Sequence, residues 1–408
     1  MSELYKTMRA SRLHGVRDLR VEDLPRPEPG PGEVLLKVAA VGTCGSDVHY
    51  YVEGRIGDQV VTAPITMGHE FSAWVAGLGE GVTGLAVGQL VAVEPAIHCG
   101  ECECCQHGHP NLCPNVRFCG TPPIDGVFAE YAVMPVENCF PLPEGFTGKS
   151  PEAPSLAVEM NGKAEDLGAA APERAKLAQA SSLIKPRRKA PGSFTPAEGA
   201  MLEPLGVAIH TVDLAHLKPG QTVAVLGAGP IGLLTAAVAR AAGASEIYVT
   251  EPLAYRRAFA LQYRSAGLAV ADAALNPDDT DVVAEIARLT GGRGVDVAFE
   301  AAGAPETPDQ AARVTRPGGK VVVAGIPSED AMTFTASVAR RKGLTIKMVR
   351  RMKHTYPRAI ALVQKGMVDV ASLATHAFPL ERIAEAFEIV AAYDDGVLRA
   401  IIQVADAF

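Results

Sequence analysis

Strand-like and helix-like patterns of apolar positions alternate through the second half of the chain. The segment 221–252, QTVAVLGAGPIGLLTAAVARAAGASEIYVTEP, predicts a strand, a glycine-rich turn, a helix and a second strand. Helices are expected near 254–266 and 281–290, and strands at 295–303 and 319–327. Strands that alternate with helices in this way predict a doubly wound α/β fold with a parallel sheet.

The region before residue 140 has a different pattern, with short, glycine-rich strands that predict a partly closed β-barrel. A strand candidate near the C-terminus, LRAIIQV at 398–404, is expected to return to this barrel. The most apolar stretch, 223–239, contains three glycines and a proline, which suits a strand, a turn and a helix better than a membrane span. We therefore expect no insertion into a membrane.

Composition narrows the class of protein. The 408 residues suffice for two or three domains, and an apolar content of 48% supports large cores without disulfides. A net charge of -8 argues against broad nucleic-acid binding. The N-terminal stretch MSELYKTMRASRLHG lacks the pattern of a secretory signal, so a cytoplasmic, thiol-reducing location is expected.

A dense cysteine cluster, HCGECECCQHGHPNLC, occupies residues 98–113. Four of its cysteines have the spacing C-x2-C-x2-C-x7-C, and four thiolates complete the tetrahedral shell of a structural zinc. The predicted ligands are Cys99, Cys102, Cys105 and Cys113. Cys104 breaks the spacing and is expected to be a spectator. The alternatives are unpaired thiols, or replacement of one ligand by His98, His107 or His109.

The glycine-rich turn predicts a dinucleotide site. It has the G-x-G-x-x-G pattern after a strand and before a helix, where backbone N–H groups meet a pyrophosphate. The turn consists of Gly227, Gly229, Pro230, Ile231 and Gly232. The carboxylate of Glu251, at the end of the next strand, would bind a ribose and repel a 2'-phosphate, which favours NAD over NADP. Arg256 and Arg257 follow closely: Arg256 is assigned to the cofactor site, and contact of either with a phosphate, or a solvated helix face, remains an alternative.

A second group of candidate ligands, Cys44, His69 and Glu70, has the mixed donor types of a catalytic zinc. The stretch GHEF at 68–71, the following GLGEGVTGLAVGQLV, the cysteine cluster and the dinucleotide fingerprint together resemble the zinc-containing medium-chain dehydrogenases. Within that family the chain is most similar to the polyol dehydrogenases that act on sorbitol and xylitol. The resemblance implies a GroES-like catalytic domain for the predicted barrel.

The resemblance also implies the residues of the active site. Glu203, in AEGAMLEPLGVAIHTV, stands where simple alcohol dehydrogenases have a cysteine ligand, and would contact the zinc directly or through water. An acidic residue at a helix start is its simpler interpretation. Ser46 and His49 would carry the alcohol proton to solvent, although His49 is also explained as a surface histidine. The implied substrate contacts are Tyr50, Phe118, Glu198 and Arg351, with Thr121 a nearby polar candidate and with core packing as the alternative for Phe118 and Met352.

The expected organisation is a catalytic domain at 1–205, completed by 348–408, and an NAD-binding domain at 206–347. Family members usually lack an insertion at about 148–193, which is alanine-rich and charged, with a helix expected around 173–182. It is interpreted as a surface excursion, or alternatively as a lid or subunit contact.

The predicted function is zinc- and NAD-dependent oxidation of a secondary hydroxyl of a polyol to a ketose. The small-molecule polyol is the expected partner of a homotetramer or homodimer. A secondary-alcohol, butanediol or threonine dehydrogenase on the same scaffold is one alternative. A catalytically silent protein that binds zinc and a dinucleotide is another.

Overall fold

A parallel sheet of six strands forms one half of the protein. This computed structural model describes residues 6–143 and 193–405. In spatial order the strands are β17 (Ala273–Leu275), β14 (Glu246–Thr250), β13 (Thr222–Leu226), β18 (Val295–Glu300), β19 (Thr315–Val323) and β20 (Thr345–Met348). Numbered along the chain this order is 3-2-1-4-5-6, the doubly wound order of dinucleotide-binding sheets. The predicted fold class is therefore confirmed for this half.

Helices cover both faces of the sheet, because its central strands are apolar on both sides. The helices are α5 (Leu202–Ala215), α6 (Pro230–Ala241), α7 (Ala254–Gln262), α8 (Val282–Leu289), α9 (Thr307–Val314) and α10 (Ala336–Lys342). Val223 and Val225 of β13 pack in one core with residues of α5 and α6. Ala224 and Leu226 point to the other face and pack in a second core with residues of α8 and α9. A continuous apolar run is the expected signature of such a doubly covered strand.

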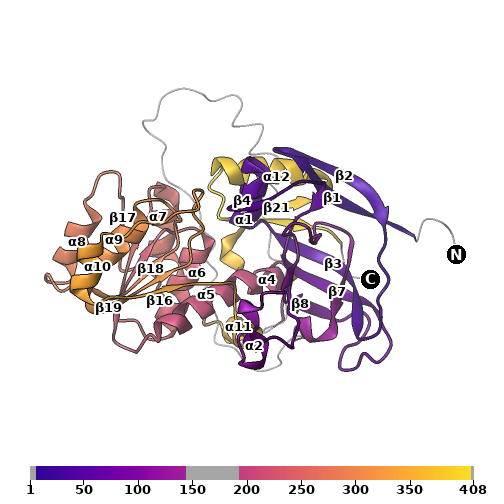
Figure 1. The fold of residues 1–408 in the computed structure, drawn as a ribbon, viewed down its shortest axis with the longest axis horizontal. Coiled ribbons are helices and arrows are strands. Elements are labelled where there is room, and N and C mark those ends of the chain that lie inside the picture. Colours follow the sequence, from indigo (N-terminus) through magenta and orange to yellow (C-terminus); the bar gives the residue numbers. More distant parts are fainter. Residues whose placement is uncertain (1–5, 144–192, 406–408) are drawn as a thin grey trace.

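A mostly antiparallel barrel forms the other half. Its largest sheet has the order β12 (Cys139–Pro141), β8 (Leu90–Val93), β7 (Glu70–Leu78), β3 (Glu33–Gly42), β22 (Arg399–Gln403) and β21 (Ala374–Pro379), with β11 (Tyr131–Pro135) also paired to β3. A three-stranded sheet adds β2 (Asp18–Pro25), β1 (Thr7–Gly15) and β6 (Ile65–Thr66). Figure 1 shows the C-terminal segment beside these N-terminal strands, and β22 pairs with β3 as the pattern at 398–404 predicts.

Short helices and hairpins complete the catalytic half and the junction. The helices are α1 (Gly45–Glu53), α2 (Glu103–Gln106), α4 (Pro196–Ala200), α11 (Tyr356–Gln364) and α12 (Ile383–Ala392). The small strand pairs are β4 (Arg55–Ile56) with β5 (Gln59–Val60), β9 (Ala96–Ile97) with β10 (Arg117–Phe118), and β15 (Arg264–Ser265) with β16 (Leu268–Ala269). No helix in the described ranges 6–143 and 193–405 is long and apolar enough to cross a membrane.

Several predicted boundaries differ from the structure. The helix expected to reach residue 266 ends at Gln262, because Ala266 and Gly267, both with positive φ, close the β15–β16 hairpin. The strands expected at 295–303 and 319–327 end at Glu300 and Val323. The insertion at 148–193 and its expected helix lie, except for Ser193, outside the described residues.

We propose the division into a catalytic domain, 1–205 with 348–408, and an NAD-binding domain, 206–347. The return of β21 and β22 to the barrel sheet supports assigning 348–408 to the catalytic domain. The proposed boundary between 205 and 206 falls inside α5, which therefore connects the two halves as a continuous helix.

Asp296, at the start of β18, connects neighbouring segments at the amino ends of the parallel strands. Its carboxylate accepts hydrogen bonds from Thr222 N at 2.9 Å, Arg293 Nη2 at 2.6 Å and Arg316 Nε at 2.7 Å. Burial alone would raise the pKa of Asp296, but these hydrogen bonds outweigh it and hold the pKa well below its usual range. The ionised form is therefore the stabilising one.

We expect Asp296→Asn to lower the free energy of unfolding at pH 7 by about 2 kcal/mol, the scale of hydrogen bonds to a charged group. Because the folded pKa is depressed, this contribution is complete above the unfolded pKa of about 4 and is lost as the pH falls toward the folded pKa. Urea unfolding of both proteins between pH 7 and pH 3 measures it. A stability difference that does not shrink with falling pH, or an equal loss in the exposed control Asp278→Asn, would contradict this assignment.

Candidate functional site

Three donor side chains meet where α1 and β7 begin. Candidate ligand atoms of Cys44, His69 and Glu70 all lie within 4.8 Å of one another. Cys44 is the N-cap residue of α1, and Glu70 is the first residue of β7. His69 and Glu70 are buried and Cys44 is half-buried. A thiol, an imidazole and a carboxylate that converge in this way fit a zinc ion with a position left for a substrate.

Asp47 supports this group and was not singled out from the sequence. One carboxylate oxygen accepts a hydrogen bond from Cys44 N at 3.1 Å, and the other lies 3.5 Å from His69 Nδ1. Asp47 also accepts a hydrogen bond from Gly68 N. A carboxylate behind a ligand histidine fixes the orientation of the ring. The available signal was its place in the capping box, three residues after Cys44.

Arg399 is a second residue that sequence reasoning missed. Its Nη2 lies 3.2 Å from Glu70 Oε1, and both side chains are almost completely buried. A guanidinium at this position compensates the charge of a carboxylate that water cannot reach. The signal was an arginine within the apolar strand candidate at 398–404.

Glu203 lies near the three donors without joining their group. It is in the first turn of α5, buried, and its carboxylate is not part of the cluster within 4.8 Å. Burial raises the pKa of Glu203 to about 8, with His69 lowering it and Glu70 raising it. Its contact with a zinc, direct or through water, stays a prediction.

Ser46 and His49 both lie on α1. Ser46 Oγ is 3.5 Å from His69 Nε2, which places the hydroxyl beside the donor group. His49 Nδ1 is 3.0 Å from Glu53 Oε1, one helical turn further on, and is partly exposed. Among the contacts of the described residues none joins Ser46 to His49, so the proton path stays a prediction.

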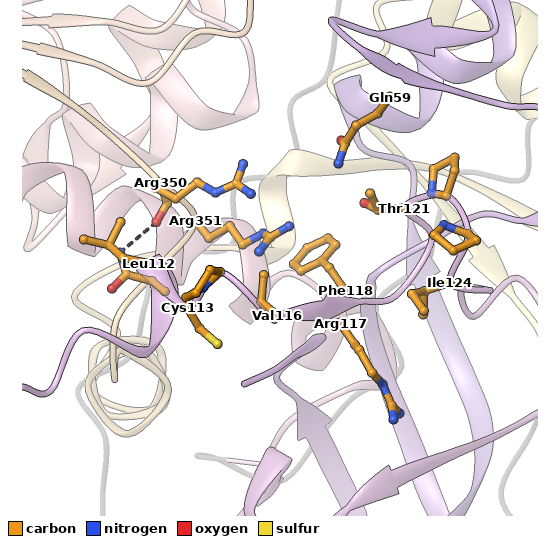
Figure 2. Close-up of a pocket in the computed structure, with 14 residues that line it drawn as sticks. Gln59, Leu112, Cys113, Val116, Arg117, Phe118, Thr121, Ile124, Arg350 and Arg351 are labelled. Carbon is orange, nitrogen blue, oxygen red and sulfur yellow. Dashed lines mark hydrogen bonds between the residues drawn. The ribbon is translucent and has the colours of Figure 1, made fainter. Parts of the chain in front are cut away.

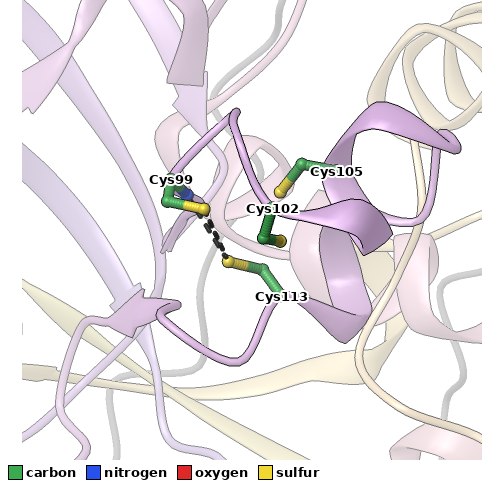
Figure 3. Close-up of side chains that lie close together, drawn as sticks. All are labelled: Cys99, Cys102, Cys105 and Cys113. Carbon is green, nitrogen blue, oxygen red and sulfur yellow. Dashed lines mark hydrogen bonds between the residues drawn. The ribbon is translucent and has the colours of Figure 1, made fainter.

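The four predicted structural ligands come together in a separate lobe. Cys99, Cys102, Cys105 and Cys113 offer sulfur atoms within 4.8 Å of one another, and they point toward a common centre in Figure 3. Cys104 and the three histidines are not in this group. Backbone N–H groups of Glu101 and Cys102 lower the pKa of the Cys99 thiol to about 6, which favours the thiolate that a metal binds. The donor set fits a closed zinc site.

The dinucleotide fingerprint forms the turn between β13 and α6. Gly227 has a φ of 99°, Gly229 is the N-cap of α6, and Pro230 is its first residue. A Cβ on Gly232 would lie 1.9 Å from Gly227 O, so only glycine lets the helix approach the strand this closely. The turn therefore presents the N-terminus of α6 at the carboxyl end of β13, where a pyrophosphate binds.

Glu251 holds the same turn from the next strand. Its carboxylate accepts hydrogen bonds from Ala228 N at 2.8 Å and Leu253 N at 3.1 Å, and it is buried. Arg256 Nη1 lies 4.0 Å from Glu251 and near Gly229, and its guanidinium is 4.9 Å from the centre of the Tyr393 ring. Arg257 instead donates to backbone oxygens of Glu251 and Pro252.

A pocket of about 610 Å³ contains two of the four predicted substrate contacts. Phe118 and Arg351 line it together with the candidate Thr121, and the Arg351 guanidinium lies 4.2 Å from the centre of the Phe118 ring (Figure 2). The Phe118 ring is also 5.1 Å from the ring of His69, so the pocket adjoins the donor group. Burial is the main cause that lowers the pKa of Arg351 to about 10, and the like charge of Arg350 is the next.

The other two predicted contacts, Tyr50 and Glu198, are not among the residues that line the pocket. Tyr50 is buried, and it donates a hydrogen bond at 3.3 Å to Oε1 of Gln59, which lines the pocket. Glu198 accepts hydrogen bonds from Thr195 N and Oγ1 at 2.8 and 2.9 Å in the capping box of α4 and does not line the pocket. Its predicted role at the substrate therefore has no support from this placement.

The fold and the site define a zinc-binding dehydrogenase with a GroES-like catalytic domain. The pattern of the alcohol dehydrogenase GroES-like domain matches residues 30–144, and that of the zinc-binding dehydrogenases matches 230–365. The chain belongs to the zinc-containing medium-chain dehydrogenase family. It is an enzyme of the alcohol dehydrogenase type within that family.

Three proteins illustrate the similarity. A sorbitol dehydrogenase of Bacillus subtilis (strain 168) is 35% identical, over 97% of both chains. D-xylulose reductase A of Aspergillus niger is 36% identical, over 93% of this chain and 92% of the other. The crystal structure of 2R,3R-butanediol dehydrogenase from Bacillus subtilis is 30% identical, covers 97% of this chain and 99% of that one, and superposes with a TM-score of 0.75. The family predicted from the sequence is confirmed.

Proposed function

We propose that the enzyme oxidises a secondary hydroxyl of a polyol of the xylitol or sorbitol type to a ketose, with NAD as the hydride acceptor and zinc as the Lewis acid. The observation that carries this proposal is the convergence of Cys44, His69 and Glu70 beside a pocket that contains a half-buried guanidinium. The similarity to a sorbitol dehydrogenase and a D-xylulose reductase supports the substrate class. Adjacent hydroxyls of a polyol offer the hydrogen bonds that such a polar pocket requires.

We assign each step of the reaction to particular residues of the chain. In the overall reaction the carbinol carbon gives up a hydride and its hydroxyl gives up a proton. Zinc bound at Cys44, His69 and Glu70 would lower the pKa of that hydroxyl, and NAD would accept the hydride. Ser46, whose Oγ lies 3.5 Å from His69 Nε2, would take up the proton, and His49 would pass it to solvent. Arg351 would donate to a neighbouring hydroxyl, and Asp47 holds His69 in place.

Specificity for NAD is proposed from Glu251. Its charge would repel a 2'-phosphate, while a ribose hydroxyl would still find a free lone pair on the carboxylate. Thiolate ligands in both donor groups suit the reducing conditions of the cytoplasm, and we propose that location together with a homotetrameric or homodimeric assembly.

A secondary-alcohol or butanediol dehydrogenase is the second candidate, favoured by the structural similarity to 2R,3R-butanediol dehydrogenase. One experiment separates the candidates: NADH formation with xylitol, sorbitol, galactitol, 2,3-butanediol, threonine and 2-propanol, repeated with NADP and after zinc chelation. Chelator-sensitive activity that is highest with a polyol supports the proposal. Activity only with butanediol, threonine or 2-propanol overturns the substrate class, and no activity in a zinc-loaded, folded sample favours a substrate outside this panel or a silent binding protein.

We expect Glu251→Gln to change the cofactor preference. The amide keeps the size of the side chain and its contact with Ala228 N but loses the charge, so kcat/KM with NAD falls about tenfold and kcat/KM with NADP rises. The matched control is Glu246→Gln at the opposite end of β14. Unchanged ratios of NAD to NADP activity in Glu251→Gln, measured by initial rates, would show that this carboxylate does not select the cofactor.

A further inference from the structure

The charged side chains that line the pocket beside the donor group are all positive. Three arginines line it, Arg117, Arg350 and Arg351, and no aspartate or glutamate is among the described residues that do so. Figure 2 shows the side chains of Arg350 and Arg351 extending side by side into the same space, whereas Arg117 points away from it. Two guanidinium groups therefore face the pocket without a lining carboxylate, and Glu94 and Glu203, the acidic groups that act on Arg351, lie outside the lining.

Arg351 is held in an unfavourable setting. Its backbone has a φ of 53°, which is costly for a residue with a side chain, and its Nη1 is buried without a hydrogen-bond partner in the described part of the chain. Neither Arg350 nor Arg351 has a carboxylate within 4.0 Å among the described residues. A buried N–H of a guanidinium without an acceptor is expensive unless a ligand supplies one.

The cysteine lobe holds the arginine pair in place. Asn111, which is buried, donates from Nδ2 to Arg350 O at 3.0 Å. Lys353 Nζ lies 3.0 Å from His109 Nδ1 in the same lobe. The contact from Asn111 holds the backbone just before Arg351, whereas the contact of Lys353 joins two side chains. The ring of Phe118 supports the Arg351 guanidinium. The pair is thus pre-organised on rigid supports.

We propose that Arg350 and Arg351 bind an anionic group, a carboxylate or a phosphate, at the end of the polyol that lies away from the oxidised carbon. This inference rests on the proposed function and specifies its substrate as a polyol that carries a terminal anion, which is an aldonate or a polyol phosphate. The anion accepts hydrogen bonds from the two planar guanidiniums, a geometry in which arginine binds both groups well. The anionic group is not changed by the reaction, in which a hydride and a proton leave the carbinol at the other end of the substrate.

Matched substrates test this proposal on the zinc-loaded enzyme. Sorbitol, L-gulonate and sorbitol 6-phosphate have the same configuration at their inner carbinols, and both anions carry their charge at the end of the chain that is C6 in sorbitol. We expect kcat/KM for L-gulonate or for sorbitol 6-phosphate to exceed that for sorbitol at least about tenfold, and this advantage to shrink as ionic strength rises. The comparison of the two anions shows whether the site prefers a carboxylate or a phosphate.

A charge-neutral variant locates the effect. Arg350→Gln is expected to lower kcat/KM for the preferred anion about tenfold or more, and to lower it for sorbitol much less, because a charge-assisted contact is lost only with the anion. Arg117→Gln removes the same charge from the arginine that points away and is expected to retain the preference. The Arg350 side chain is exposed, so the variant should fold, which far-UV circular dichroism checks.

The outcomes separate this inference from the proposed function. If sorbitol is used at least as well as both anions, and Arg350→Gln affects all three equally, the anion site is wrong while the function stands. If none of the three compounds is oxidised, the proposed function is wrong, and calorimetry with L-gulonate and sorbitol 6-phosphate decides the site. Binding that Arg350→Gln weakens supports it, and the absence of binding to either compound overturns it.

Discussion

Replacement of Cys44 by alanine is expected to reduce kcat for polyol oxidation by at least about 1000-fold, since Lewis-acid stabilisation is worth several kcal/mol and each 1.4 kcal/mol is a factor of ten. The thiol is one of three donors within 4.8 Å, and the alanine offers no ligand atom. Zinc content should fall by one ion per chain while the cysteine lobe keeps its own. Initial rates of NADH formation and metal analysis of the same sample measure both effects.

The fold of this variant is expected to be preserved. Cys44 is half-buried at the N-cap of α1, and loss of a cap costs about 1 kcal/mol. The control is Cys104→Ala, which removes a half-buried thiol outside both donor groups. Retention of more than a tenth of the wild-type kcat in Cys44→Ala would show that this donor group is not the centre of the reaction.

The parallel half of the fold was predictable because its information is local. The strand of residues 222–226 is apolar on both faces, and the glycine turn and α6 follow within a few positions, so pattern and spacing were sufficient. The termination of α7 was harder. The hairpin that replaces the last turn of the expected helix requires a positive φ at Ala266. Alanine rarely adopts such a φ, so the residue type gives no indication of the hairpin.

The site also contains residues that the local sequence indicates and residues that depend on contacts between distant parts of the chain. Cys44, His69, Glu70 and the cysteine lobe were found because their residue types and spacing indicate metal binding. Arg399 was missed because it joins the site only through the pairing of β22 with β3, far along the chain. Glu198 shows the reverse case, since a residue placed by resemblance is used by a local capping box.

The cysteine lobe is expected to matter for activity as well as for stability. Cys113, its most buried ligand, follows Asn111 by two residues, and Asn111 holds the backbone of Arg350. Because a structural zinc supplies folding free energy to the segment that binds it, loss of one ligand should disorder the lobe and release this contact. Damage to the metal site would then reach the substrate pocket through Asn111.

Cys113→Ala is therefore expected to lose one zinc per chain, to lower Tm by about 5 °C or more, and to raise KM for the polyol by about tenfold. Metal analysis, calorimetry and initial rates measure these changes, and hydrogen exchange should increase at residues 98–113. Cys104→Ala, in the same lobe but outside the donor group, should behave like the wild type. A variant that loses the zinc and the stability but keeps its KM would show that the lobe does not position the pocket, because the contact from Asn111 to Arg350 would then be dispensable.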